Sequence, residues 1–178
     1  MHFVVFDLET RNSFQDVGGR QNLHLLGISV AVVWDSRTNE FAVYREPAMD
    51  TLVDHLRSAP CVVGFNLIHF DYPVLQPYTT FSLQTLPTLD MLDHLYRKLG
   101  FRVSLNNLAR TTLKVKKSAD GLQAIHWYRS GDWQKLIKYC QEDVRITRDL
   151  YLFGKQNGYL LFWDGKYRIE RKVPVSWT

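Results

Sequence analysis

The sequence has few cysteines and no long apolar run. Cys61 and Cys140 are its two cysteines, and neither a CxxC nor an HExxH motif occurs. These absences argue against a disulfide framework and a zinc site, so we expect both thiols to be reduced and buried. No segment approaches the roughly 20 apolar residues of a membrane-spanning helix. Because Met1 leads almost directly into an expected strand, no room is left for a signal sequence, and we expect a cytoplasmic protein with no membrane partner.

The composition is that of a globular protein, and the order of the expected elements indicates an α/β fold. A length of 178 residues with 46% hydrophobic residues fits one domain, residues 1–178. We expect strands near residues 2–8, 24–34, 40–45, 61–64 and 85–89, and helices near residues 49–58, 71–76, 90–99, 104–112, 121–129 and 132–155. Strands as a meander, then alternating with helices, predict a mixed β-sheet flanked by α-helices. A hairpin at about residues 158–171, turning at Asp164 and Gly165, is expected to pack on this domain.

One acidic residue interrupts the apolar face of the last predicted helix. Apolar residues at helical spacing form one inward stripe, and Asp143 lies on its edge between Leu136 and Leu150. Tyr139 lies one turn before Asp143. Because burying an unpaired carboxylate costs several kcal/mol, Asp143 must meet a cation or be well hydrogen-bonded.

Three further acids lie at the ends of apolar segments. Asp7 and Glu9 are two residues apart at the end of the first strand, so both carboxylates point to one side of it. Asp71 follows the apolar strand that begins at Cys61. Singly, each acid could be a solvent-exposed strand end, a turn residue or a member of a surface ion pair. Jointly, a folded sheet could gather all four, and their oxygen atoms suit a hard divalent cation such as Mg²⁺ or Mn²⁺.

The spacing of these residues resembles a known family. Phe6–Thr10, Gly64–Asp71 and Tyr139–Asp143 are similar to the three motifs of DEDD-type 3′→5′ exonucleases, which belong to the DnaQ-like, ribonuclease H-like superfamily. Tyrosine four residues before the last aspartate resembles the DEDDy branch, and the chain as a whole resembles YprB-like ribonuclease H-like domains. The resemblance covers about residues 1 to 155. Arg11 departs from the pattern, since many relatives carry a small hydroxyl residue there.

The resemblance implies a ribonuclease H-like fold and a two-metal exonuclease. Asp7, Glu9, Asp71 and Asp143 would bind two divalent cations, Mg²⁺ or Mn²⁺, and Tyr139 would orient the attacking water. The product would be nucleoside 5′-monophosphates, released from a single-stranded 3′ end. Single-stranded DNA is the favoured substrate and RNA the alternative. A helicase or another repair or processing protein would be the protein partner.

Substrate-binding candidates lie beside the motifs and in a basic stretch. Thr10, Phe65 and Asn66 flank the motifs, and Lys114, Lys116 and Lys117 follow the predicted helix at 104–112. The net charge of +4 includes all 18 acids. With four of them assigned to metals, the remaining surface is more basic and favours a polyanionic partner.

Two other functions fit the same residues. A structure-specific endonuclease could use the same metal centre, because selectivity for an end depends on what blocks the groove beyond it. A non-catalytic nucleic-acid-binding module could retain the fold, although the presence of all four acids together with Tyr139 argues against it.

Overall fold

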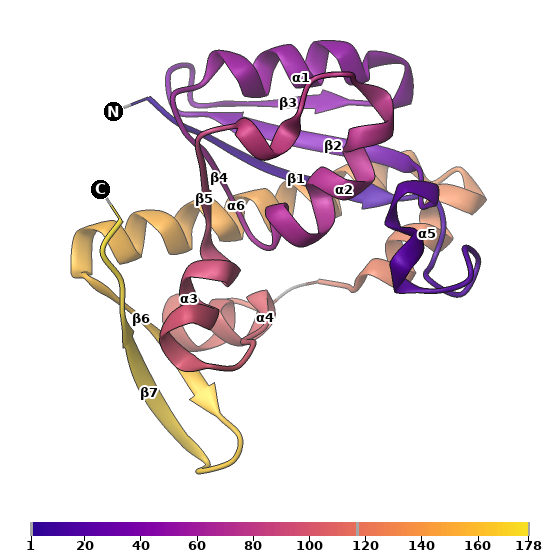
Figure 1. Cartoon of the computed structure of the whole chain (residues 1–178). Coiled ribbons are helices and arrows are strands. Elements are labelled where there is room, and N and C mark those ends of the chain that lie inside the picture. The colour runs from indigo at the N-terminus through magenta and orange to yellow at the C-terminus, as the bar shows by residue number, and fades with distance from the viewer. Residues whose placement is uncertain (1, 117, 178) are drawn as a thin grey trace.

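A five-stranded mixed sheet forms the centre of the molecule (Figure 1). The structure, a computed structural model, describes residues 2–116 and 118–177. The strand order is β3-β2-β1-β4-β5, formed by Glu40–Tyr44, Ile28–Asp35, Val4–Thr10, Val62–Gly64 and Thr88–Asp90. β1, β2 and β3 are antiparallel neighbours, whereas β4 and β5 run parallel to β1. The predicted mixed sheet is therefore confirmed, with β1 at its centre.

Helices cover both faces of the sheet. α1 (Met49–Ser58) and α2 (Tyr72–Leu75) pack on one face. The opposite face is covered by α3 (Met91–Leu99), α4 (Leu105–Leu108), α5 (Gly121–Ser130) and the long α6 (Trp133–Asn157). Among the described residues, no helix is both long and apolar enough to span a membrane.

Several expected elements differ from the structure. β2 begins at Ile28 rather than near residue 24, because Arg20–Leu25 form 3₁₀ turns that bring the chain back to the sheet. The predicted helices near 71–76 and 104–112 are composite: a π-helical turn, Leu67–Asp71, precedes α2, and another, Ala109–Leu113, follows α4. Both cysteines are free, as expected, but Cys61 is only half-buried.

The predicted C-terminal hairpin is present. β6 (Tyr159–Asp164) and β7 (Ile169–Pro174) pair in antiparallel register, and in Figure 1 the hairpin lies beside α3 and α4, apart from the main sheet. Its turn spans residues 165–168, so it is longer than a two-residue turn at Asp164 and Gly165. The chain then returns to α6, where Trp177 stacks on Tyr151 with ring centroids 5.7 Å apart.

A buried carboxylate, that of Asp35 at the end of β2, joins this strand to α1. Asp35 accepts hydrogen bonds from the backbone N–H (2.7 Å) and the guanidinium (3.2 Å) of Arg37. The imidazoles of His2 and His55 lie 3.1 and 3.3 Å from its carboxylate oxygens. Burial alone would raise the pKa of Asp35, but these donors outweigh burial and lower the pKa to about 2.

Candidate active site

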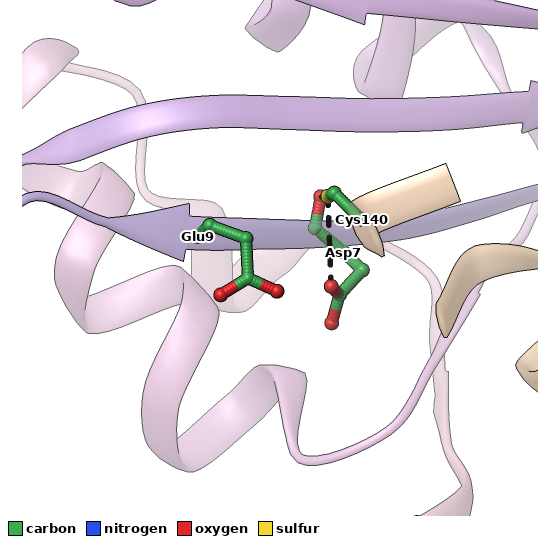
Figure 2. Close-up of side chains that lie close together, drawn as sticks. All are labelled: Asp7, Glu9 and Cys140. Carbon is green, nitrogen blue, oxygen red and sulfur yellow. Dashed lines mark hydrogen bonds between the residues drawn. The ribbon is translucent and has the colours of Figure 1, made fainter. Parts of the chain in front are cut away.

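The strand β1 carries two acids on the face covered by α6. Phe3 and Val5 pack into the core beneath α6, and strand alternation places Asp7 and Glu9 in the same row. Figure 2 shows both carboxylates directed to the same side of β1. A β-bulge follows at Glu9 and Thr10, where the register with β2 shifts. Such irregularities redirect side chains at strand ends, and this one lies where the acidic row ends.

Cys140 on α6 completes this cluster. One ligand atom from each of Asp7, Glu9 and Cys140 lies within 4.8 Å of the other two. The thiol lies 3.6 Å from the carbonyl oxygen of Asp7 and 3.7 Å from its carboxylate, a contact drawn in Figure 2. Burial and the charges of Asp7, Glu9 and Asp143 raise the pKa of the thiol, so it stays protonated and donates to Asp7. The sequence indicated a buried thiol here but not its contact with the acids.

α6 also supplies Asp143 and Tyr139. Both are buried, with 5% and 3% of their surfaces exposed. Burial, and then the carboxylates of Glu9, Asp143 and Asp7, raise the pKa of the Tyr139 phenol. Asp7 lies beside Glu9 and lines one hollow with Asp143, so β1 and α6 bring the three acids together although the residues are far apart in sequence. The phenol is neutral at physiological pH and can donate a hydrogen bond.

The π-helical turn before α2 brings Asp71 to the same strand. The Asp71 carboxylate accepts the backbone N–H of Leu8 at 3.2 Å, which fixes the turn to β1. Burial and the neighbouring charge of Asp7 raise the pKa of Asp71 well above its ordinary value. The structure therefore places all four predicted acids around β1.

Asp90 at the end of β5 holds the segment that leads to Asp71. It caps α3 by accepting the N–H groups of Leu92 (3.0 Å) and Asp93 (3.3 Å). It also accepts the N–H groups of Asn66 (2.8 Å) and Ile68 (3.0 Å). Asn66 adopts a left-handed conformation, φ 75°, where the chain leaves β4. The second pair of contacts was missed, because nothing in the sequence indicates which loop meets a helix cap.

Two hollows adjoin Asp7. The larger, about 540 Å³, is lined by Asp7, Glu9, Thr10 and Asp71, and its other walls are mainly apolar, including Phe14, Phe65, Phe70, Leu122 and Ile125. The second, about 420 Å³, is lined by Asp7, Asp143, Phe65, Asn66, Arg102 and Ser104, with Leu92, Val103 and Leu105. Asp7 and Phe65 line both hollows, so the two adjoin at these residues.

Arg102 is the cation of the second hollow. Its guanidinium donates to the Asn66 carboxamide oxygen at 2.9 Å. Sequence reasoning missed Arg102, because it lies outside the motifs and outside the basic stretch after α4. Arg11, in contrast, forms an ion pair with Glu46 at 2.7 Å and does not line either hollow.

The predicted substrate residues divide into two groups. Thr10, Phe65 and Asn66 lie at the hollows beside the acids, and the Thr10 hydroxyl donates to the carbonyl oxygen of Asn12 at 2.9 Å. Lys114 and Lys116 line neither of these hollows. Lys114 instead pairs with Glu170 of the hairpin at 3.3 Å, and Lys116 lines a third hollow, which it shares with Tyr139. Lys117 lies outside the described residues.

The donor set fits a hard divalent cation. Four carboxylates surround the end of β1, and the raised pKa of Asp71 reflects both its burial and its repulsion by Asp7. A bound cation would offset this repulsion, and oxygen-rich sites of this kind suit Mg²⁺ or Mn²⁺. The neutral thiol of Cys140 is a poor ligand for such ions.

Comparisons with known proteins agree with the architecture. Residues 4–153 match the model of the RNase_H superfamily. No curated protein matches the chain significantly. A similar solved structure is that of the family B DNA polymerase from the hyperthermophilic archaeon Pyrobaculum calidifontis, with a TM-score of 0.63 and 14% identity. The match covers 88% of this chain but 24% of the polymerase, so the chain spans about a quarter of that protein's length, and the likeness is one of fold.

Proposed function

The chain belongs to the RNase_H superfamily, and from this premise we propose that it is a metal-dependent nuclease that removes nucleotides from a single-stranded 3′ end. The observation that carries the proposal is the convergence of Asp7, Glu9, Asp71 and Asp143 around the end of β1, with Tyr139 beside them. A structural ion-pair network would not need four carboxylates beside two open hollows. A cation site that binds phosphodiesters accounts for both features.

The four acids would hold two divalent cations, Mg²⁺ or Mn²⁺. Such ions, when bound, activate water and stabilise the charge on a departing oxygen in phosphodiester hydrolysis. The contribution of the chain itself is placement. The N–H of Leu8 holds Asp71 against β1, and the thiol of Cys140 donates to Asp7. These contacts restrict the carboxylates before any ion binds, which lowers the entropic cost of binding it.

Tyr139 would orient the attacking water rather than remove its proton. Its pKa is raised by burial and by the adjacent carboxylates, so the phenolate is not available near neutral pH. The neutral hydroxyl can still donate or accept one hydrogen bond. Tyrosine at this position is the reason to assign the DEDDy branch.

The larger hollow supports terminal cleavage. Its acidic rim and apolar wall match a terminal nucleoside, whose base would pack near Phe65, Phe70 and Leu122 while its phosphate reaches Asp7. Thr10 and Asn66 are the candidates for contacts with the terminal sugar or phosphate. Arg102 would bind a phosphate on the other side of Asp7, because a guanidinium pairs well with phosphate oxygens.

The test is cleavage of matched single-stranded DNA and RNA, each labelled at the 5′ or the 3′ end, with Mg²⁺ or Mn²⁺. We expect a ladder of 5′-labelled products shortened in single-nucleotide steps, with release of nucleoside 5′-monophosphates. Asp7→Asn should abolish cleavage, whereas Asp54→Asn, an exposed acid on the opposite face of the sheet, should cleave at the wild-type rate.

Other product patterns would contradict the proposal. Internal fragments without a ladder would indicate an endonuclease. Tight binding without cleavage by the wild-type chain in either metal would indicate a non-catalytic binding module. Retained metal-dependent cleavage by Asp7→Asn would remove Asp7 from the mechanism.

A further inference from the structure

Another surface, beside the hairpin, carries aromatic and basic groups away from the four acids. Trp163 on β6 is 50% exposed and lines a hollow of about 500 Å³ with Arg110, Lys114 and Glu170. The rest of its lining is polar and comes from α4 and the turn after it: Ser104, Asn106, Asn107 and Thr111. A large exposed indole that lines a hollow together with two cations is not needed to close the core. It calls for a ligand that is both aromatic and anionic.

Side chains of α4 and of the turn after it bind the backbone of β6, which fixes the position of Trp163. The Asn107 carboxamide accepts the N–H of Trp163 at 2.7 Å and donates to its carbonyl oxygen at 2.9 Å. The Thr112 hydroxyl makes the same pair of bonds with Leu161, at 2.9 and 2.7 Å. These side chains satisfy the outer edge of β6 as a neighbouring strand would. The indole ring therefore projects from a strand whose backbone is held in place by hydrogen bonds.

This hollow adjoins the candidate active site. Ser104 lines both the Trp163 hollow and the hollow that contains Asp7, Asp143 and Arg102. Asn106 lines both the Trp163 hollow and the hollow that contains Tyr139 and Lys116. The start of α4 is thus shared by surfaces leading from the acids to the hairpin. A chain bound at the acids could continue over this segment.

The charges along this path suit a polyanion. Arg102, Arg110, Lys114 and Lys116 line the three hollows around α4. Glu170 offsets part of the charge, since it pairs with Lys114 at 3.3 Å.

We propose that single-stranded nucleic acid upstream of the cleaved nucleotide runs from Arg102 over the start of α4 to the hairpin, where one base stacks on Trp163 and a phosphate contacts Arg110. This inference rests on the proposed function and extends it to the remainder of the substrate. A base offers a flat ring to the indole, and the backbone offers one charge per nucleotide to the cations. The hairpin thereby makes binding depend on substrate length.

The first test measures binding without cleavage. Wild-type protein in EDTA is titrated with fluorescent single strands of about three and about twelve nucleotides, since site sizes of single-strand binders start at about four. Trp163→Ala should weaken binding of the longer strand by about five- to a hundredfold, the value of one stacked base, and leave the short strand unchanged. Arg110→Gln should reduce the slope of log affinity against log salt by about 0.7, the value of one phosphate on a single strand.

The matched control is Tyr167→Ala. Tyr167 is 59% exposed in the turn of the same hairpin and does not line the hollow. The Tyr167→Ala variant should bind both strands as the wild type does. Unchanged binding by Trp163→Ala, equal losses on both strands, or an equal loss in Tyr167→Ala would overturn the proposed path. Loss of a dimer in Trp163→Ala, with binding intact, would show instead that this face joins two copies of the chain.

Cleavage of the same two strands in Mg²⁺ separates this inference from the proposed function. If both hold, Trp163→Ala lowers kcat/KM on the longer strand alone. If the wild type fails to cleave but its binding in EDTA still depends on length and on Trp163, the path stands and the nuclease proposal fails. If the wild type cleaves both strands but neither binding nor cleavage depends on length or on Trp163, the nuclease proposal stands and the path fails.

Discussion

Removal of the Tyr139 hydroxyl tests the candidate active site at its most specific residue. Tyr139→Phe deletes one oxygen beside Asp7, Glu9 and Asp143 and keeps the ring. If the hydroxyl orients water in the transition state, the rate should fall about ten- to a thousandfold, since one positioned hydrogen bond there is worth about 1.4–4 kcal/mol. Metal affinity should be nearly unchanged, because none of the four carboxylates is altered.

The effect on stability should be much smaller. The ring is 3% exposed and packs edge-on against Trp127 with centroids 5.9 Å apart. Phenylalanine retains this packing, so the free energy of unfolding should change by no more than about 1 kcal/mol, the net value of a typical hydrogen bond. A large loss of activity with a small change in stability would separate a role in chemistry from a role in folding.

The assay is single-turnover cleavage of a 5′-labelled single strand across a range of pH. Tyr151→Phe is the matched control, since it removes a hydroxyl from the same helix at a 1% exposed position in the core. Because burial, the largest cause, raises the pKa of Tyr139 even where a cation offsets the neighbouring carboxylates, the wild-type rate should not decline through ionisation of this group as pH approaches 10. A Tyr139→Phe rate equal to wild type, or equal to that of Tyr151→Phe, would refute the reasoning.

Two further predictions concern buried carboxylates. The pKa of Asp35 is about 2 in the folded chain and about 3.9 in the unfolded chain, so the ionised carboxylate stabilises the fold above pH 4 and this stability is lost as pH falls toward 2. Asp35→Asn should therefore reduce the difference in the free energy of unfolding in urea between pH 7 and pH 3 by about 1–2 kcal/mol. An unchanged difference would contradict the assignment. Asp90→Asn should cost about 2 kcal/mol at pH 7, because an amide nitrogen cannot accept the N–H of Ile68. It should also slow cleavage by releasing the segment that leads to Asp71, whereas wild-type cleavage would show that this segment needs no such support.

Much of the site arrangement could be predicted because local periodicity determines it. Strand alternation placed Asp7 and Glu9 on one face, and helical spacing placed Tyr139 beside Asp143. The hairpin, too, follows from local turn and strand preferences, although its turn is longer than expected.

The remaining features depend on contacts between distant segments. Arg102 meets Asn66 across 36 positions of sequence, and Asn107 meets Trp163 across 56. No periodicity links such pairs, since they result from how α3 and α4 pack against the sheet and the hairpin. The sequence predicts substrate contacts for the lysines of one basic stretch, Lys114, Lys116 and Lys117. Lys114 and Lys116 instead line different hollows, because a π-helical turn and the left-handed conformation of Lys114, φ 59°, separate their directions.

The placement of these groups suggests how the site divides its tasks. The acids lie on β1, α6 and a turn fixed to β1, and rigid elements hold a metal geometry more precisely than loops do. The cations Arg102, Arg110 and Lys114 lie in the segment between α3 and α5, outside the sheet. Changes in that segment or in the hairpin could alter which nucleic acid binds without moving a carboxylate. Substitutions in residues 101–116 and in β6 should therefore change the affinity for a long strand more than substitutions beside β1 do.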